Sequence, residues 1–518
     1  MSTQTSIATT SWTCSLTSAS NEINDKGHSC HGLPTSTISL MKKQIPTTER
    51  VFQIFKELNQ IPRPSHHEEH VADYLCLFAE RLNLAYERDT ENCVVIRKPA
   101  TPGHEGAEPV VLLNHMDMVC VGMNDPLNDS IDAYVENGWM KAHGTSLGAD
   151  NGIGLSMALA VLESADIIHG PLEVITTTNE EDGMSGAAQL SKDFLKGRKV
   201  INLDSEDYDT ITTGAAGACL QFHRIPIERQ TAPKDGNWYH IRFSGGLGGH
   251  SGVDINKNRC STVTATQVLL NAIRQEHDFD ITSVNIGEAN ASIASSAEII
   301  ICLPSADADF MKKQEQTMNK WLNNQFGNSD PGIHCTISPS DKQDTVIDHK
   351  TIDTLLNGLK KIPQGVVKMS ETMTGTVETS NNIGRIQTEK DCIVVSTHTR
   401  SFIDNEMKKL SHAIAEAFAS CNAKSETVMS APAWQENQQS AFLQLTSDTF
   451  QDVLGWRPRM VAMHFVLEAG FFVQHYPGIQ IASIGPRIVE PHSTSERVEL
   501  STIEDIWRVL LELLKRLA

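Results

Sequence analysis

The sequence predicts an α/β fold, in which a mixed, largely parallel sheet carries helices on both faces and is interrupted by an inserted α+β segment. Two observations predict this fold. Strand-like apolar runs alternate with helical patterns over residues 93–203, which is the rhythm of βαβ units. Near Gly214 the pattern changes to alternating strands with two long helical stretches, and α/β character returns from residue 430.

The elements follow from periodicity. Residues 48–82 show two amphipathic helical faces, separated by the break at Pro62-Arg63-Pro64. Residues 152–164 are apolar and follow a Gly-rich turn, which predicts a buried helix. We expect further strands at 240–243, 297–302 and 392–397, and further helices near 259–275, 306–325 and 502–517.

Four strand-like runs are each followed by residues that can bind metal. The runs are 110–114, 172–178, 200–203 and 479–484, and the residues that follow them are His115 with Asp117, Glu180 with Glu181, Asp204, and His492. Asp150 lies in the Gly148–Gly154 turn between the first two runs. Ligands of open α/β sheets bind outside the carboxyl ends of the strands, so these side chains are expected to meet at one edge.

Each of these residues alone has an ordinary structural explanation. Asp150 could simply cap its helix, and the acidic runs near Glu180 and Asp204 could be solvated loops. Together, however, several carboxylates at one edge would repel one another without a cation. Two divalent ions about 3.5–4 Å apart would neutralise them and could hold one bridging water.

Glu180 and Glu181 are adjacent, so they cannot point the same way in a regular strand. A turn at this point allows one carboxylate to bind metal while the other faces the water. A hydrolase needs that division between ligand and general base.

Composition excludes other classes of function. The 518 residues carry a formal net charge of −21, which argues against nucleic acid and anionic membranes as partners. The eleven cysteines form no C-x-x-C pair and are expected to be reduced thiols in a cytoplasmic compartment. No run of about 18 apolar residues predicts a transmembrane helix.

Residues 1–40 are rich in Ser and Thr and contain no apolar segment typical of a secretory signal. Residues 1–21 are poor in acids, as transit peptides are, but the tail lacks the Arg that these peptides need. We favour a disordered tail. A translation start at Met41 is the alternative.

Two other motifs contain residues that could bind a ligand. His66-His67-Glu68-Glu69-His70 matches the inverted zinc-peptidase pattern H-x-x-E-H, but a capping box made by Ser65 and Glu68 is favoured. The Gly-rich run 245–252 lacks the Lys-Ser/Thr of a phosphate-binding loop. It is expected to be a tight turn that positions His250, with a flexible turn bearing an exposed histidine as the alternative.

The ligand motifs, taken in order, resemble the M20 family of dinuclear zinc peptidases, and within it the dipeptidases. The similarity runs from about Thr48 to the C-terminus. It also includes Val377-Glu378-Thr379-Ser380, Arg400-Ser401-Phe402-Ile403-Asp404 and Ser483-Ile484-Gly485-Pro486. It implies a zinc-exopeptidase-like sheet with an inserted lid.

The resemblance also implies a role for each site residue. Asp150 would bridge two metal ions, through a segment with a cis peptide bond to Asn151. His115 and Asp204 would complete the site of one ion, and Glu181 and His492 that of the other. The ions would be Zn²⁺, with Co²⁺ or Mn²⁺ as alternatives.

The remaining roles concern proton transfer and substrate. Asp117 would orient His115. Glu180 would take the proton of the bridging water, and His250 of the lid would stabilise the oxyanion. Arg400 would bind the free carboxylate of the substrate, and Asn290 would contact the substrate as well. The segment around Asn290 matches the family poorly, and Ala469 stands where a Cys is expected.

The resemblance divides the chain into four segments. Residues 1–43 lie outside it as an N-terminal extension. Residues 44–217 and 430–518 would form two parts of one catalytic domain, and residues 218–429 a lid through which a homodimer forms.

The predicted function is hydrolysis of unblocked dipeptides, with Xaa-His, including β-Ala-His, as the leading substrate and broad specificity. Two alternatives stay open. One is an aminoacylase or deacetylase of the same family that acts on N-acyl amino acids. The other is a non-catalytic binding protein, against which the complete ligand set and Glu180 argue.

Overall fold

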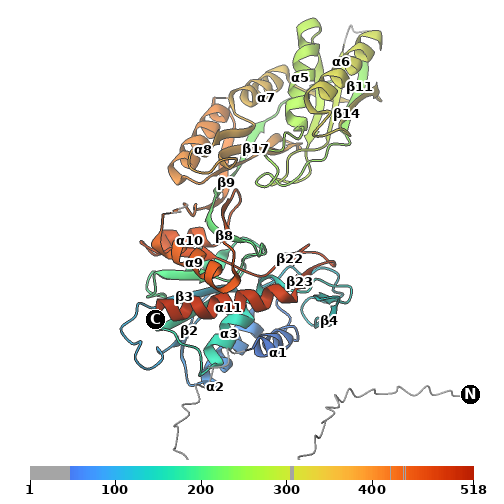
Figure 1. Cartoon of the computed structure of the whole chain (residues 1–518). Helices are drawn as coiled ribbons and strands as arrows, with labels where there is room; N and C mark the ends of the chain where they lie inside the picture. The colour runs from blue at the N-terminus through green and yellow to red at the C-terminus, as the bar shows by residue number, and fades with distance from the viewer. Residues whose placement is uncertain (1–46, 304–307, 421, 436, 438) are drawn as a thin grey trace, which may run out of the picture. The chain divides into compact units, whose positions relative to one another are not determined.

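The structure is a computed structural model that describes residues 47–303, 308–420, 422–435, 437 and 439–518. The predicted N-terminal extension and the Met41 start lie outside the described residues. Two large sheets and one small sheet organise the described chain (Figure 1). No helix among the described residues is both long enough and apolar enough to cross a membrane.

The first large sheet has eight strands, and its centre is parallel. In spatial order the strands are β1 (Ala85–Arg88), β2 (Val94–Lys98), β6 (Leu172–Thr177), β3 (Val110–His115), β7 (Lys199–Asn202), β21 (Gln480–Ser483), β8 (Thr210–Ala215) and β20 (Arg459–Met463). Strand β3 pairs in parallel with β6 and β7, and β7 pairs in parallel with β21. The four predicted strands therefore end at the same edge, as expected.

Helices cover both faces of this sheet, which confirms the predicted fold class. On β3, Val110 and Leu112 belong to one hydrophobic cluster, whereas Val111 and Leu113 belong to another. The first cluster contains residues of α1 (Glu49–Leu58), α2 (Glu69–Arg81), α3 (Ala149–Glu163), α9 (Ala441–Leu454) and α11 (Leu500–Leu517). The second contains residues of α4 (Ser185–Gln189) and α10 (Ala469–His475).

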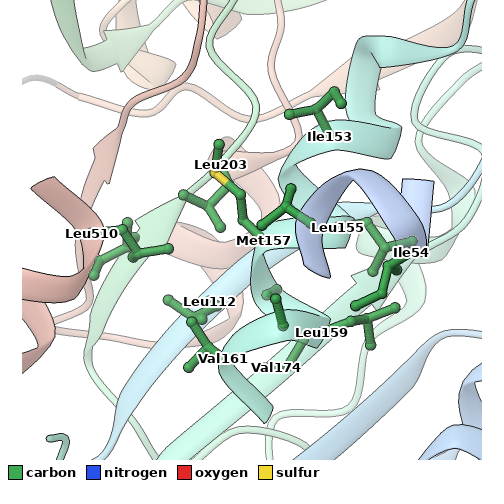
Figure 2. Packing of buried hydrophobic residues seen from close by; sticks show 14 of the residues in the cluster. Ile54, Leu112, Ile153, Leu155, Met157, Leu159, Val161, Val174, Leu203 and Leu510 are labelled. Carbon is green, nitrogen blue, oxygen red and sulfur yellow. The ribbon is translucent and has the colours of Figure 1, made fainter. Parts of the chain in front are cut away.

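Figure 2 shows the first cluster at its centre. Leu155 and Leu159 of α3 lie toward Ile54 of α1, whereas Met157 and Val161 lie on the side of Leu203 and of Leu112 on β3. These side chains are almost completely buried. Residues 152–162 of α3 are buried all round, so the helix runs through the interior, as its uniformly apolar sequence predicts.

The capping box predicted at the start of α2 is wrong. The helix begins at Glu69, and no side chain caps it. Ser65 Oγ instead donates to Asp117 Oδ2 at 2.8 Å, and Glu68 Oε1 accepts the backbone N–H of Asn179 at 2.9 Å. Both polar side chains are used to hold the loops at the strand ends, where buried backbone N–H groups need partners.

The second large sheet has eleven strands, and its strand pairs are antiparallel. Its main path is β14 (His334–Pro339), β11 (Asn237–Ser244), β13 (Ala297–Leu303), β12 (Asp280–Ile286), β17 (Val377–Thr388), β18 (Cys392–Ser401), β9 (Gly217–Pro226) and β19 (Lys424–Ala431). The short strands β10 (Arg229–Thr231), β15 (Thr345–Ile347) and β16 (Gly365–Met369) pair off this path.

One face of the second sheet packs on helices (Figure 1). These are α5 (Thr262–Glu276), α6 (Ala308–Phe326), α7 (His349–Lys361) and α8 (Asp404–Ala419). They share a hydrophobic core with the sheet that is separate from the clusters of the first sheet. On β18 this core takes Ile393 and Val395, so the alternation of the strand puts His398 and Arg400 on the opposite face.

The chain passes from the first sheet to the second between β8 and β9, and it leaves the second sheet after β19. Both crossings lie close to the boundaries predicted at residues 217 and 430. The division into a catalytic domain and an inserted lid domain stays a prediction.

A small four-stranded sheet was not predicted. Its order is β22 (Ile488–Val489), β23 (Arg497–Glu499), β5 (Trp139–Ala142) and β4 (Ala133–Glu136). The loop between β22 and β23 contains His492 and Glu496. Pairing of β23 with β5 therefore anchors this C-terminal loop beside the chain that leads into α3.

Candidate metal centre

The predicted metal ligands come together at the carboxyl edge of the first sheet. His115 is the last residue of β3, Glu181 follows β6, and Asp204 follows β7. Asp150 lies in the first turn of α3, and His492 lies in the β22–β23 loop. Five segments that are distant in the sequence thus deliver these side chains to one place.

The five side chains form two groups that share Asp150. In the first group, His115 Nε2 lies 3.1 Å from Asp150 Oδ1 and 3.2 Å from Asp204 Oδ1. In the second, His492 Nε2 lies 3.3 Å from Asp150 Oδ2 and 2.9 Å from Glu181 Oε1. Each carboxylate oxygen of Asp150 thus faces a different group.

The electrostatics show that the cluster is short of positive charge. Burial raises the pKa of Asp204 to about 6, and burial also raises the pKa of Glu181. Hydrogen bonds to Asp150 and Glu181 raise the pKa of His492 to about 11. Protons thus partly neutralise the carboxylates, and divalent cations would do the same. Carboxylate and imidazole donors at these separations fit divalent metal.

Asp117 holds the turn that carries Glu180 and Glu181. Its carboxylate accepts their backbone N–H groups at 3.1 and 3.2 Å, and it lies 3.4 Å from His115 Nδ1. The carbonyl oxygen of Asp117 lies closer to the same nitrogen, at 3.1 Å. With Nδ1 fixed by Asp117, Nε2 of His115 faces the first group.

The turn before α3 depends on Glu496, which the sequence did not single out. Its carboxylate accepts the backbone N–H groups of Leu147, Gly148 and Ala149 at 2.7, 2.9 and 2.8 Å. The first N–H groups of a helix need an acceptor, but no sequence pattern identifies one that lies 347 to 349 positions away. Glu496 therefore fixes the segment that presents Asp150.

Two further features shape this turn. Gly148 has φ +66°, and a Cβ there would lie 2.5 Å from Arg63 Nη2, so a side chain would not fit. The peptide bond between Asp150 and Asn151 is cis, as the resemblance implied. Asn151 Nδ2 donates to Asp204 Oδ1 at 2.7 Å and so links two of the segments.

A cavity of about 460 Å³ opens beside both groups. Its walls include Glu180 and Glu206 from loops that follow strands of the first sheet, His250 from the loop after β11, and His398 and Arg400 from β18. Burial raises the pKa of Glu180 well above its usual value, and Glu180 belongs to neither ligand group. Asn290 is not among the residues that line this cavity, and its role stays a prediction.

No sequence pattern assigned a role to two further acidic residues near the site. Glu468 is buried, accepts the Thr177 hydroxyl at 2.7 Å, and has a pKa that burial raises to about 8. Burial likewise raises the pKa of Glu206 to about 8. Glu206 lies in the acidic run near Asp204, whereas no sequence pattern points to Glu468, which precedes a helix far from the strand ends.

The rival H-x-x-E-H motif takes part in no metal group within the described chain. His66 and His70 are both exposed. His66 Nε2 lies 2.9 Å from Asp182 Oδ2, and both side chains are largely open to solvent. A solvated pair of this kind is typical of a surface contact.

Comparisons with known proteins agree with this geometry. A model of peptidase family M20/M25/M40 matches residues 111–516. The cytosol non-specific dipeptidase of Escherichia coli K12 is 32% identical over 471 residues, which cover 90% of this chain and 97% of the relative.

Solved structures give the same result. The aminoacylhistidine dipeptidase of Vibrio alginolyticus is 32% identical, has a TM-score of 0.84, and is matched over 90% of this chain and 96% of its own. Aminopeptidase PepT of Bacillus cereus has a TM-score of 0.58 at 17% identity, covers 91% of this chain and 99% of its own, and supports the fold alone. The resemblance found in the sequence is therefore confirmed, and the chain belongs to peptidase family M20/M25/M40.

Proposed function

We propose that this chain is a metal-dependent dipeptidase that hydrolyses unblocked dipeptides, with Xaa-His, including β-Ala-His, as the leading substrates. One observation carries the proposal: Asp150 joins two groups of metal ligands beside a cavity that also contains Glu180 and Arg400. The dipeptidase names of the Escherichia coli and Vibrio relatives support the substrate class.

The donor set supports two divalent ions per chain, with Zn²⁺ preferred and Co²⁺ or Mn²⁺ as alternatives. His115, Asp150 and Asp204 would hold one ion, and Asp150, Glu181 and His492 the other. When bound, the ions would supply Lewis acidity toward the substrate carbonyl and lower the pKa of water. Asp117 keeps His115 in position, as its contacts suggest.

Glu180 is the proposed general base. It accepts a proton from the attacking water as the new C–O bond forms, and it returns the proton to the leaving amine as the C–N bond breaks. Its place in the cavity, outside both ligand groups, supports this division from Glu181.

His250 is the proposed oxyanion donor. The backbone N–H of Val253 donates to His250 Nδ1 at 3.3 Å, so a neutral ring carries its proton on Nε2. Burial and the nearby Arg400 lower the pKa of His250, which favours the neutral ring. Its Nε2–H can then donate to the oxygen of a tetrahedral intermediate.

Arg400 is proposed to bind the free carboxylate of the substrate. The side chain is 3% exposed, and among the described residues its Nε has no hydrogen-bond partner. A buried guanidinium needs an anionic partner, and a carboxylate matches its planar donors. A contact of Asn290 with substrate, a homodimer formed through the lid, and a cytoplasmic location remain further proposals.

An aminoacylase that takes N-acyl amino acids is the second candidate, because Arg400 would also suit the carboxylate of such a substrate. A panel of dipeptides assayed beside N-acetyl amino acids separates the two, provided that metal content is measured on the same sample. Turnover of Ala-His with none of N-acetylhistidine supports the dipeptidase, and the reverse result replaces it with the aminoacylase. Bound metal without turnover of either class would favour the non-catalytic alternative.

Metal removal is expected to abolish hydrolysis of Ala-His. The donors of both groups are carboxylates and imidazoles, and the Lewis acidity proposed above depends on the ions that they would hold. The measurement is the rate after treatment with 1,10-phenanthroline, and again after addition of Zn²⁺, Co²⁺ or Mn²⁺. The non-chelating 1,7 isomer is the control, and full activity in a metal-stripped sample would contradict the proposal.

Arg400→Lys is expected to raise KM for Ala-His by about 10- to 100-fold, because Lys cannot reproduce the planar pair of hydrogen bonds. The measurement is kcat and KM for Ala-His and for its C-terminal amide. The variant should discriminate less than the wild type between the acid and the amide. Equal kcat/KM of the wild type for the acid and the amide would contradict the proposed contact between Arg400 and the substrate carboxylate.

A further inference from the structure

His398 lies two residues before Arg400 on β18. This stretch of β18 pairs with β9 without any register shift, so the two side chains lie on the same face of the sheet. Both line the cavity beside the two metal groups. The proposed function has so far given His398 no role.

The environment of His398 is unusual for a structural histidine. The residue is only 4% exposed, yet neither ring nitrogen has a hydrogen-bond partner among the described residues. An unpaired polar group in the interior costs free energy, so such groups are nearly always paired. A ligand in the cavity would supply the missing partner.

His223 of the same sheet gives the contrast. It is also buried, but its Nδ1 lies 2.8 Å from Ser425 Oγ and its Nε2 lies 2.9 Å from Thr397 Oγ1. His223 is therefore a histidine whose hydrogen bonds are satisfied within the fold. His398, on the cavity side, is not.

Charge indicates what His398 can offer. Burial lowers the pKa of His398 well below its usual value, and the nearby Arg400 and His250 lower it further. The ring is therefore neutral, with one N–H donor and one acceptor nitrogen. Beside a permanent guanidinium, a neutral donor can add a hydrogen bond to an anion without repelling Arg400.

Resting on the function proposed above, we propose that His398 is a second substrate-binding residue, which donates a hydrogen bond to the C-terminal carboxylate of a dipeptide beside Arg400. A carboxylate has two oxygens with about four acceptor positions, so it can accept from both side chains at once. Arg400 supplies the charge. His398 adds a directional donor that favours a carboxylate over a C-terminal amide.

Binding can be measured without turnover in the Glu180→Gln variant loaded with Zn²⁺. The probes are Ala-His and its C-terminal amide, and the method is isothermal titration calorimetry. Adding His398→Phe is expected to weaken binding of the acid by about 10- to 100-fold, the usual range for a hydrogen bond to a charged group. Binding of the amide should change less than about threefold.

Further variants separate this role from a structural one. His398→Leu is a second variant without a donor, and either His398→Gln or His398→Asn should recover part of the affinity, since each retains an amide N–H. The Tm of His398→Phe should equal or exceed that of the parent, because an unpaired buried group has been removed. His223→Phe should lower Tm and leave the affinity for the acid unchanged.

Three results would overturn the assignment. If His398→Phe and His398→Leu bind Ala-His as tightly as the parent does, His398 does not contact the substrate carboxylate. Equal weakening of acid and amide would place His398 against another part of the ligand. If the parent binds no dipeptide at all, the proposed function fails, and the role of His398 fails with it.

Discussion

The Glu180→Gln variant is expected to keep its metal ions while kcat for Ala-His falls by about 10²- to 10⁴-fold, the usual loss when a general base is removed. Glu180 lines the cavity but belongs to neither ligand group, so the substitution leaves both groups intact. Gln has nearly the same shape as Glu and cannot accept the proton. The measurements are kcat and the metal content of the same sample.

The neighbouring residue supplies a matched control. Glu181 Oε1 lies 2.9 Å from His492 Nε2, within one ligand group. Glu181→Gln is therefore expected to lower the metal content of the protein, which Glu180→Gln leaves unchanged. If Glu180→Gln emptied the site while Glu181→Gln left the metal in place, the two roles would be exchanged. An unchanged kcat in Glu180→Gln would show that Glu180 is not the general base.

The residues at the carboxyl edge of the first sheet could be predicted because buried strands have a recognisable sequence pattern. Buried parallel strands are continuous apolar runs, and the residues just after them must lie at one edge. His115, Asp204 and the pair Glu180-Glu181 follow from that rule, whereas the choice of Glu181 as the ligand came from the family resemblance. His492 follows less directly, because eight residues lie between it and the end of β21.

The supporting residues could not be found in this way. Glu496 acts on backbone N–H groups that carry no sequence signature, and Glu468 acts on the hydroxyl of Thr177. Their partners are set by tertiary structure. The wrong capping box has the same origin: Ser65 and Glu68 match a local rule, but Asp117 and Asn179 are the partners that the fold brings close.

His464 connects the two large sheets near the cavity. It follows β20 of the first sheet, and its Nε2 lies 2.8 Å from the hydroxyl of Ser380 on β17 of the second. Ser380 is paired across the ladder with Arg400. Through β17, the strand that carries Arg400 and His398 is thus linked to the first sheet by a contact that no sequence pattern predicted.

Asp150→Asn is expected to remove both metal ions from each chain and to abolish turnover. Each carboxylate oxygen of Asp150 faces a different group, so one substitution weakens both sites. The neutral amide of Asn keeps the shape of the side chain, but it offers one oxygen in place of two and carries no charge. Metal content after extensive dialysis is the measurement.

Asp204→Asn is the matched comparison, because Asp204 belongs to the first group only. It should leave about one ion per chain in the group of Asp150, Glu181 and His492, against about two in the wild type. Retention of two ions in Asp150→Asn would show that Asp150 does not join the groups. Loss of both ions in Asp204→Asn would show that the second group does not hold metal without the first.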